Sequence, residues 1–431
     1  MSANRRLGPF RHAPFAVYWA GGFPSNLGTW LHIVAASVVV YAMSGSALAV
    51  GILGFGGFLP ILLFSVYGGL LADRYDRRLV VIWCSGASIG ASSILTVLTL
   101  AGLATEIHII AVTFALNTAY ALSKPAYIAL IPSLVPREDL TDAVGLNALQ
   151  FILGQIIGPI MATLILASAG AAWAFGINGI SFLGPILAMA YLYRAGIGSG
   201  EGPLHPASGS ERRVESSGVA FVRAHPWVLA LLIGVVATAV PLEFLRTLSP
   251  ALVSEGLGEP ESSAGIVVAA QSVGSLFALM VFVPLRRRGW SRPMAAVGMI
   301  LQGFGLIGAA FAPTLAVMSI AVALVGFGFS LCFPVLTGVL QGETPDGVRG
   351  RVMSYHQVAH LGNRPFAAIV VGLLAALFGA QYALFGGLAL VPIGLLAIRI
   401  AWRRLGKDPD AKSRPPETAV DPATATPTDA P

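Results

Sequence analysis

Charged residues are scarce in this sequence: Asp, Glu, Lys and Arg make up 11% of its 431 residues. A soluble domain carries about 25% charged residues, because its surface must be hydrated. So few charges cannot cover a water-exposed surface of this size, which excludes a soluble multidomain protein. The 56% of hydrophobic residues and the mean hydropathy of +0.79 indicate instead a chain whose surface faces lipid.

Cysteine is almost absent as well, and so are the motifs of several enzyme classes. The two cysteines, Cys84 and Cys332, lie far apart in apolar runs without the spacing of a metal site, and we interpret them as small buried side chains. The sequence contains no Walker A motif and no Ser/His/Asp constellation. Its one G-x-G-x-x-G match, residues 303–308, lies inside a predicted apolar helix rather than after a strand, so it does not indicate a dinucleotide site. We therefore expect no enzyme activity, no cofactor, no metal and no ATP drive within this chain.

Long apolar runs, by contrast, fill most of the chain. The first run, residues 15–43, is too long for the apolar part of a signal peptide and is predicted to remain as a spanning helix. Because a spanning helix needs about 20 mainly apolar residues, the sequence predicts an all-α polytopic membrane protein with twelve transmembrane helices. The predicted helices cover residues 15–43, 47–72, 79–103, 107–132, 142–168, 172–194, 226–252, 262–285, 293–311, 315–341, 351–377 and 380–402.

The basic residues predict the orientation of these helices. All but three of the 26 Lys and Arg residues fall in, or within four residues of, the N-terminal segment, the even-numbered loops or the C-terminal segment, whereas the odd-numbered loops hold glutamates. Basic residues collect on the cytoplasmic side of a membrane. We therefore expect both termini in the cytoplasm and a location in the cell (inner) membrane. The basic pI of about 9.5 is then explained by the cytoplasmic loops, and we expect no nucleic-acid partner.

The chain divides near its middle. Residues 195–225, rich in Gly, Ser, Pro and charge, are predicted to be a cytoplasmic linker between two six-helix bundles, residues 1–194 and 226–404, and residues 405–431 are predicted to be a disordered tail. The halves look related, because Pro125 and Pro136 are spaced like Pro334 and Pro345. Duplicated halves around a central loop are typical of transporters that work by alternating access.

The loop after the second predicted helix carries the most specific motif. In GGLLADRYDRR, residues 68–78, Gly68 and Gly69 permit close helix contact before Asp73 marks the membrane edge. An ordinary basic loop is the alternative, but it would need neither Gly69 nor Asp73. Together with YWAGGFPSNLGTWLH (18–32), LVPREDLTDAVGLN (134–147) and TPDGVRGRVMS (344–354), the motif resembles the major facilitator superfamily, in particular the drug:proton antiporter group that includes the enterobactin exporter.

This resemblance implies a fold and roles for several residues. It implies two pseudo-symmetric six-helix bundles around a central cavity lined by helices 1, 4, 7 and 10. It also implies that the loop motif is a gate, whose Asp73 contacts a neighbouring helix end in the outward-open state. The gating residues would be Gly69, Asp73, Arg74, Arg77 and Arg78. Gly154, Gly158 and Pro159 resemble the antiporter motif of exporters, although they also fit simple helix packing with a bend.

Three basic residues, Lys124, Arg246 and Arg364, lie deep inside the predicted helices, away from their cytoplasmic ends. A charge at mid-membrane costs about 2.5–3.5 kcal/mol on insertion scales and marks a pathway or a buried pair. On one interpretation, Lys124 and Arg364 attract an anionic group of a substrate. On the other, they are structural, and Arg246 pairs with Glu243 one turn earlier. The predicted substrate-cavity residues are Asn26, His32, Asn117, Tyr120, Lys124, Gln150 and Arg364, and the predicted proton-coupling residues are Glu243, Arg246 and His32.

These observations predict a secondary active transporter, a monomer in the lipid bilayer. It would export a small organic molecule such as a drug, an antibiotic or a siderophore-like compound, by alternating access and with the proton as coupling ion. The alternatives are an importer, a lipid or lysophospholipid flippase on the same fold, and a membrane receptor or scaffold that transports nothing.

Overall fold

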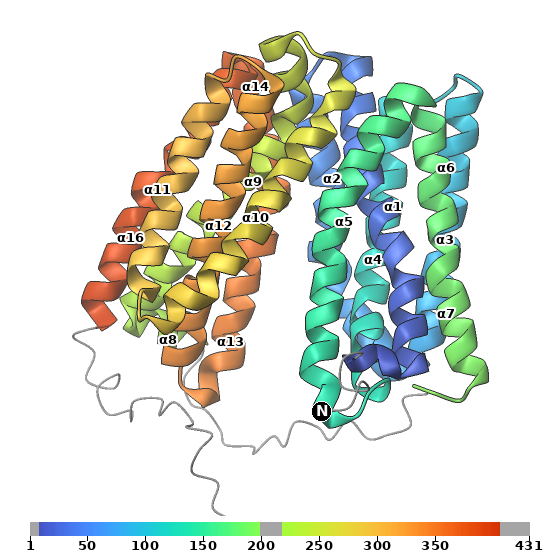
Figure 1. Ribbon diagram of the computed structural model, residues 1–431, viewed down its shortest axis with the longest axis horizontal. Coiled ribbons are helices and arrows are strands. Elements are labelled where there is room, and N and C mark those ends of the chain that lie inside the picture. Colours follow the sequence, from blue (N-terminus) through green and yellow to red (C-terminus); the bar gives the residue numbers. More distant parts are fainter. Residues whose placement is uncertain (1–7, 199–217, 406–431) are drawn as a thin grey trace, which may run out of the picture.

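The computed structural model describes residues 8–198 and 218–405, and every regular element in this part of the chain is helical (Figure 1). The first half contains η2 (Gly8–Arg11), α1 (Ala13–Ser44), α2 (Ala47–Arg74), α3 (Arg77–Leu100), α4 (Glu106–Ala129), η3 (Ile131–Ser133), η4 (Arg137–Asp139), α5 (Leu140–Ser168), α6 (Ala171–Ser181) and α7 (Leu183–Arg194). The second half contains α8 (Gly218–Ala224), α9 (Pro226–Leu257), η5 (Glu261–Ser263), α10 (Ala264–Arg287), α11 (Ser291–Ala310), α12 (Leu315–Glu343), α13 (Asp346–Gln357), η6 (Val358–Gly362), α14 (Arg364–Phe378), α15 (Ala380–Leu388) and α16 (Leu390–Leu405). Most of the predicted linker and residues 406–431 of the predicted tail lie outside the described residues.

Twelve helical segments within the described residues are long and apolar enough to cross a membrane, which confirms the predicted number. The largest differences in bounds are in the fifth, which begins at Arg137 rather than at residue 142, and in the seventh, which continues to Leu257 rather than ending at residue 252. The sixth and twelfth are each interrupted. Pro185 and Pro392 lack the N–H that would bond the carbonyls of Ser181 and Leu388, the last residues of α6 and α15.

The outer surface of the helices is strongly apolar. Val66, Trp83, Ile107 and Leu377 are each more than 70% exposed, at 72%, 76%, 76% and 74%. Exposed apolar side chains of this size, repeated over helices that can span a bilayer, are expected to lie in lipid. The chain is therefore a multi-pass membrane protein.

The two halves contact each other mainly through two helix pairs, α2 with α14 and α5 with α10, and α9 adds smaller contacts with α1 and α2. Glycine permits both approaches: a Cβ at Gly51 would lie 2.5 Å from the Ala368 carbonyl oxygen, and one at Gly265 would lie 2.1 Å from the Pro159 carbonyl oxygen. In Figure 1 the first half (blue to green) and the second half (yellow to red) converge at the upper end of the view and diverge at the lower end.

The buried apolar side chains follow the same division. One core cluster contains residues of both halves, such as Val34 and Val38 of α1 with Leu248 and Leu252 of α9, near the ends of these helices that adjoin the odd-numbered loops. At the opposite end each half has its own cluster, around Tyr18 in the first half and around Leu231 in the second. The halves are thus closed against each other at one end only.

Candidate functional site

A buried charge cluster lies between α9 and α14. Oε1 of Glu243 lies 3.0 Å from Nη1 of Arg246 and 3.3 Å from Nε of Arg364. The Glu243 side chain is only 2% exposed. One carboxylate is therefore shared by two guanidinium groups, and with Glu243 ionised the cluster has one positive charge in excess.

The charge cluster also contacts the first half. The guanidinium carbon of Arg246 lies 5.1 Å from the ring centroid of Trp30 in α1, and that of Arg364 lies 5.3 Å from the ring centroid of Phe58 in α2. Such cation–π contacts contribute about 0.5–2 kcal/mol each, more when they are desolvated. Nε of Arg246 is buried and has no hydrogen-bond partner among the described residues. A change in the charge of Glu243 would therefore act on contacts between the two halves.

The pairing differs in part from both interpretations of the sequence. Arg246 does pair with Glu243 one turn earlier, as the spacing indicated. Arg364, which we had grouped with Lys124, lies on the same carboxylate instead. The sequence did not indicate this contact, because Glu243 and Arg364 lie on helices far apart in the chain. The coupling and cavity roles of these residues remain predictions.

Arg364 follows a π-helical turn, η6, that was not predicted. Pro365 cannot donate to the carbonyl of Leu361 and its ring would crowd that group, so the helix widens just before it. The Asn363 side-chain amide donates to the carbonyls of Ala359 and His360 within this turn. The ring of His360 packs on Phe333, with centroids 4.4 Å apart. The Arg-Pro pair inside an apolar run was the available signal for this irregular segment.

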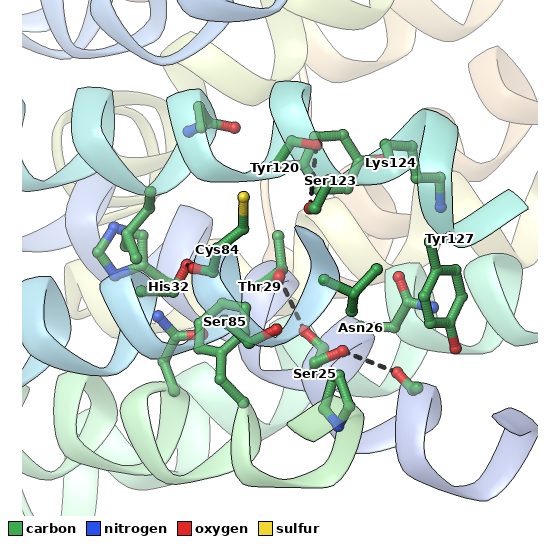
Figure 2. Close-up of a pocket in the computed structure, with 18 of the residues that line it drawn as sticks. Ser25, Asn26, Thr29, His32, Cys84, Ser85, Tyr120, Ser123, Lys124 and Tyr127 are labelled. Carbon is green, nitrogen blue, oxygen red and sulfur yellow. Dashed lines mark hydrogen bonds between the residues drawn. The ribbon is translucent and has the colours of Figure 1, made fainter. Parts of the chain in front are cut away.

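A polar pocket lies inside the first half, between α1, α3, α4, α6 and α7, with a volume of about 90 Å³ (Figure 2). Five of the predicted cavity residues line it: Asn26, His32, Asn117, Tyr120 and Lys124. Gln150 lies beside it, with Oε1 accepting a hydrogen bond of 2.9 Å from Asn26. Arg364 does not line this pocket, so the predicted cavity residues fall into two separate sites.

The pocket also has polar residues that sequence reasoning missed. Ser85 and Ser88 come from α3, and Asn178 comes from α6. Ser85 and Ser88, with Ser92, recur at i, i+3 and i+7 on one face of α3, and this spacing was the available signal, whereas Asn178 is revealed only by the packing of α6. His32 is 3% exposed, and its Nε2 lies 3.0 Å from the Thr113 hydroxyl of α4.

The size of the pocket limits what it can hold. A pocket for a drug-sized ligand typically has roughly 300–1,000 Å³, whereas this one has about 90 Å³. It has room for a few water molecules or one small chemical group. A whole organic substrate does not fit there in this conformation.

Only some residues of the loop motif contact other parts of the structure. Asp73 and Arg74 are exposed and have no hydrogen bond or ion pair within the described residues, whereas Arg77 donates to the carbonyls of Ala72 and Ala129 and so joins the ends of α2 and α4. The close helix contact is made by Gly68, where a Cβ would lie 2.4 Å from the Ala121 carbonyl oxygen. A Cβ at Gly69 would have nothing within 4 Å. The gating role of Gly69 and Asp73 remains a prediction.

Arg78 of the motif pairs with Asp76 at the start of α3. Nε of Arg78 lies 2.9 Å from Oδ1 of Asp76, and its Nη1 donates to the carbonyl of Ile197 beyond α7. Burial raises the pKa of the Asp76 carboxyl, but hydrogen bonds from the side chain and backbone of Arg78 outweigh it and hold this pKa below its usual value. The pair is therefore ionised at neutral pH and ties α3 to the end of α7.

The helix 5 motif contacts both α1 and the second half. A Cβ at Gly154 would lie 3.2 Å from Cδ1 of Trp30, and one at Gly158 would lie 2.6 Å from Cβ of Trp30. The Pro159 carbonyl instead approaches Gly265 of α10. These residues thus place the Trp30 ring, which covers Arg246, and hold α5 against the other half. That these residues act as an antiporter motif remains a prediction.

Comparison with known proteins shows the family. Residues 4–427 match a family model described as transmembrane secretion effectors. Similar proteins include the multidrug efflux pump Tap of Mycolicibacterium fortuitum (26% identical, covering 96% of this chain and 100% of Tap), the enterobactin exporter EntS of Salmonella choleraesuis (27%, 90% and 92%) and the staphyloferrin A transporter of Staphylococcus aureus (24%, 84% and 89%).

Solved structures show the same fold. A bacterial homologue of the human lysosomal transporter Spinster, in an inward-facing and unoccupied conformation, superposes with a TM-score of 0.73 at 15% identity and covers 93% of this chain and 98% of its own. A bacterial homologue of the iron transporter ferroportin, in an inward-facing state, gives 0.70 at 17% identity, with 93% and 99% covered. Both confirm two bundles of six helices.

Proposed function

The chain belongs to the transmembrane secretion effector family of the major facilitator superfamily, and on this premise we propose that it is a proton-coupled exporter of a small organic molecule. Membership makes it a transporter rather than an enzyme. The similar proteins include one described as a multidrug efflux pump and one described as an exporter of enterobactin, which supports outward transport of a drug-like or siderophore-like compound.

The single observation that carries proton coupling is the shared carboxylate of Glu243. It is buried, and it holds Arg246 and Arg364, each of which lies on an aromatic ring of the other half. Protonation of Glu243 would leave two guanidinium groups without a counter-charge in a low-dielectric site, which is strongly unfavourable. The halves would then move to a state in which the guanidinium groups are better solvated or paired. A proton taken up at one carboxylate thereby drives the rearrangement.

The closure of the halves at one end supports alternating access. The closed end adjoins the odd-numbered loops, which hold no Lys or Arg, and the other end carries the basic loops. If the basic loops are cytoplasmic, as the positive-inside rule predicts, both termini are cytoplasmic and the described conformation faces inward. In the outward-facing state the loop motif would close the inner end, and Asp73, now exposed, would find its partner there.

The experiment that tests this function compares cells that lack the chain with cells that overproduce it. Each is grown against a broad panel of antibiotics, dyes and iron chelators, with and without a protonophore. We expect overproduction to raise, and deletion to lower, tolerance of at least one compound class, and we expect the protonophore to abolish the difference. Unchanged tolerance over the whole panel, or a difference that the protonophore leaves intact, would remove the proposal. Greater sensitivity on overproduction would indicate an importer.

A further inference from the structure

The first-half pocket contains a cation without a counter-charge. Lys124 lines it, and no Asp or Glu does. Its Nζ lies 5.4 Å from the ring centroid of Tyr120 and 5.9 Å from that of Tyr127, and it forms no ion pair within the described residues. Arg246 and Arg364, by contrast, share Glu243. The two tyrosine rings hold the ammonium group at the pocket but leave its charge without an anion.

Buried polar atoms in the same pocket also lack partners. Nδ1 of His32 and Oδ1 of Asn178 are buried without a hydrogen bond in the described part of the chain, and these side chains are 3% and 1% exposed. Nε2 of His32 contacts Thr113, and Nδ1 has almost no surface that a water molecule could touch. Nearly all buried polar groups in proteins are hydrogen-bonded, to the protein, to water or to a ligand. The polar side chains around the pocket are therefore only partly paired by the protein itself.

Size and position restrict this occupant. The volume of about 90 Å³ is well below that of a site for a drug-sized ligand, roughly 300–1,000 Å³, and suits a carboxylate-sized group with some water. Figure 2 shows Lys124 and Tyr127 at one end of the pocket and His32 at the other, with the hydroxyl groups of Ser25, Thr29 and Ser85 between them. The charge thus lies at one end of a slot lined by neutral polar groups.

We propose that this pocket binds one small anionic group, a carboxylate or an inorganic anion of similar size, which pairs with Lys124. The group has two conceivable sources, a free anion or the acidic end of the transported molecule. In the second case the inference rests on the proposed function and narrows it: the substrate is an organic acid. Its acidic group enters the first half, and the remainder stays outside the pocket. The Glu243 cluster in the second half is a separate site.

The test measures the binding of simple probes to the purified full-length chain in lipid nanodiscs by titration calorimetry. The probes are benzoate, its neutral isostere benzamide, acetate and chloride. We expect benzoate to bind and benzamide not to bind. Lys124→Met should weaken benzoate binding by at least about tenfold, the effect of losing one charge-assisted hydrogen bond. Lys124→Arg should retain binding, and Arg399→Gln, which removes an exposed charge elsewhere, should bind like the unmodified chain.

The outcomes distinguish the two sources of the anion and can disprove the anion site at Lys124. Benzoate binding supports the acidic end of an organic substrate. Binding of acetate or chloride without benzoate overturns the organic-acid substrate and leaves a free-anion site. Equal binding of benzoate and benzamide by the unmodified chain, no binding of any anion, or unchanged benzoate binding in Lys124→Met overturns the anion site. Because binding is measured without a proton gradient, a failure of export or of proton coupling leaves this result standing.

Discussion

At the scale of residues, the central feature is one carboxylate shared by two cations. The spacing of Glu243 and Arg246 on one helix made their pairing predictable, since side chains one turn apart lie on one face. Asn117, Tyr120 and Lys124, all predicted cavity residues, are likewise spaced one turn apart on α4 and line one site. The contact of Arg364 with Glu243 was not predictable, because it depends on how α14 packs on α9 and no local pattern encodes that.

Replacing the shared carboxylate tests its role in coupling. In Glu243→Gln two buried guanidinium groups lose their counter-charge, and breaking a buried pair in this way costs about 3–5 kcal/mol. We expect no proton-dependent efflux and a lower melting temperature of the purified chain. Glu259→Gln, an exposed glutamate outside the charge cluster, is the control and should change neither.

A double variant separates coupling from stability. Glu243→Gln with Arg364→Gln has the same net charge in the cluster as the unmodified chain. Its melting temperature should therefore be higher than that of Glu243→Gln alone, but proton-dependent efflux should not return. If efflux returns with stability, Glu243 is structural and carries no coupling proton.

At the scale of elements, the spanning helices were predictable, whereas their irregularities were not. About 20 apolar residues suffice to identify a spanning helix. The breaks before Pro185 and Pro392 and the π-helical turn before Pro365 follow from missing N–H groups, yet proline is tolerated in many such helices without a break, so sequence alone did not locate them. The glycine pair of the loop motif shows the same limit: Gly68 contacts α4 and Gly69 does not, which depends on the rotation of α2.

The two glycine sites give a matched prediction on packing. In Gly158→Ala the new Cβ would overlap Trp30, so we expect overpacking that destabilises the chain by about 1–3 kcal/mol. In Gly69→Ala the new Cβ meets open space, and we expect an unchanged melting temperature. Thermal unfolding of the two purified variants checks this. Equal melting temperatures for both variants would contradict the described packing of α5 on α1.

The loop motif allows function to be separated from stability. Asp73 is exposed and without a partner in this conformation, so Asp73→Asn should leave the melting temperature and the amount of protein unchanged. Efflux should nevertheless be lost, because the gate would lack its carboxylate in the opposite state. Asp142→Asn, another exposed aspartate near the basic loops, serves as the control and should transport normally. Normal efflux in Asp73→Asn would remove the gating role.

At the scale of the whole molecule, contacts between the halves gather at one end. The Tyr41 hydroxyl donates to the Glu255 carboxylate, and the Thr163 hydroxyl donates to the Ser262 carbonyl at 2.8 Å. At the other end Val144 of α5 and Val283 of α10 are 51% and 50% exposed. The duplicated halves were predictable from the sequence, but which end is closed was not, because both states of an alternating-access transporter must be encoded by one sequence.

Cysteine pairs test this closure. In a background with Cys84→Ala and Cys332→Ala, a pair at Thr163 and Ser262 should cross-link readily on oxidation and block transport until it is reduced. A pair at Val144 and Val283 should cross-link poorly in the described conformation and increasingly as the transporter cycles with substrate. Equal cross-linking of the two pairs without substrate, or transport by the chain cross-linked at Thr163 and Ser262, would contradict closure at this end.

The most direct measurement uses liposomes that contain only the purified chain, an internal pH-sensitive dye, and the compound whose tolerance changes most in cells. With the interior made acidic, we expect the compound to accumulate inside against its own gradient while protons leave, and we expect neither flux in Glu243→Gln. Accumulation without proton movement, or equal accumulation with and without the pH gradient, would contradict the claim that this chain is a proton-coupled exporter.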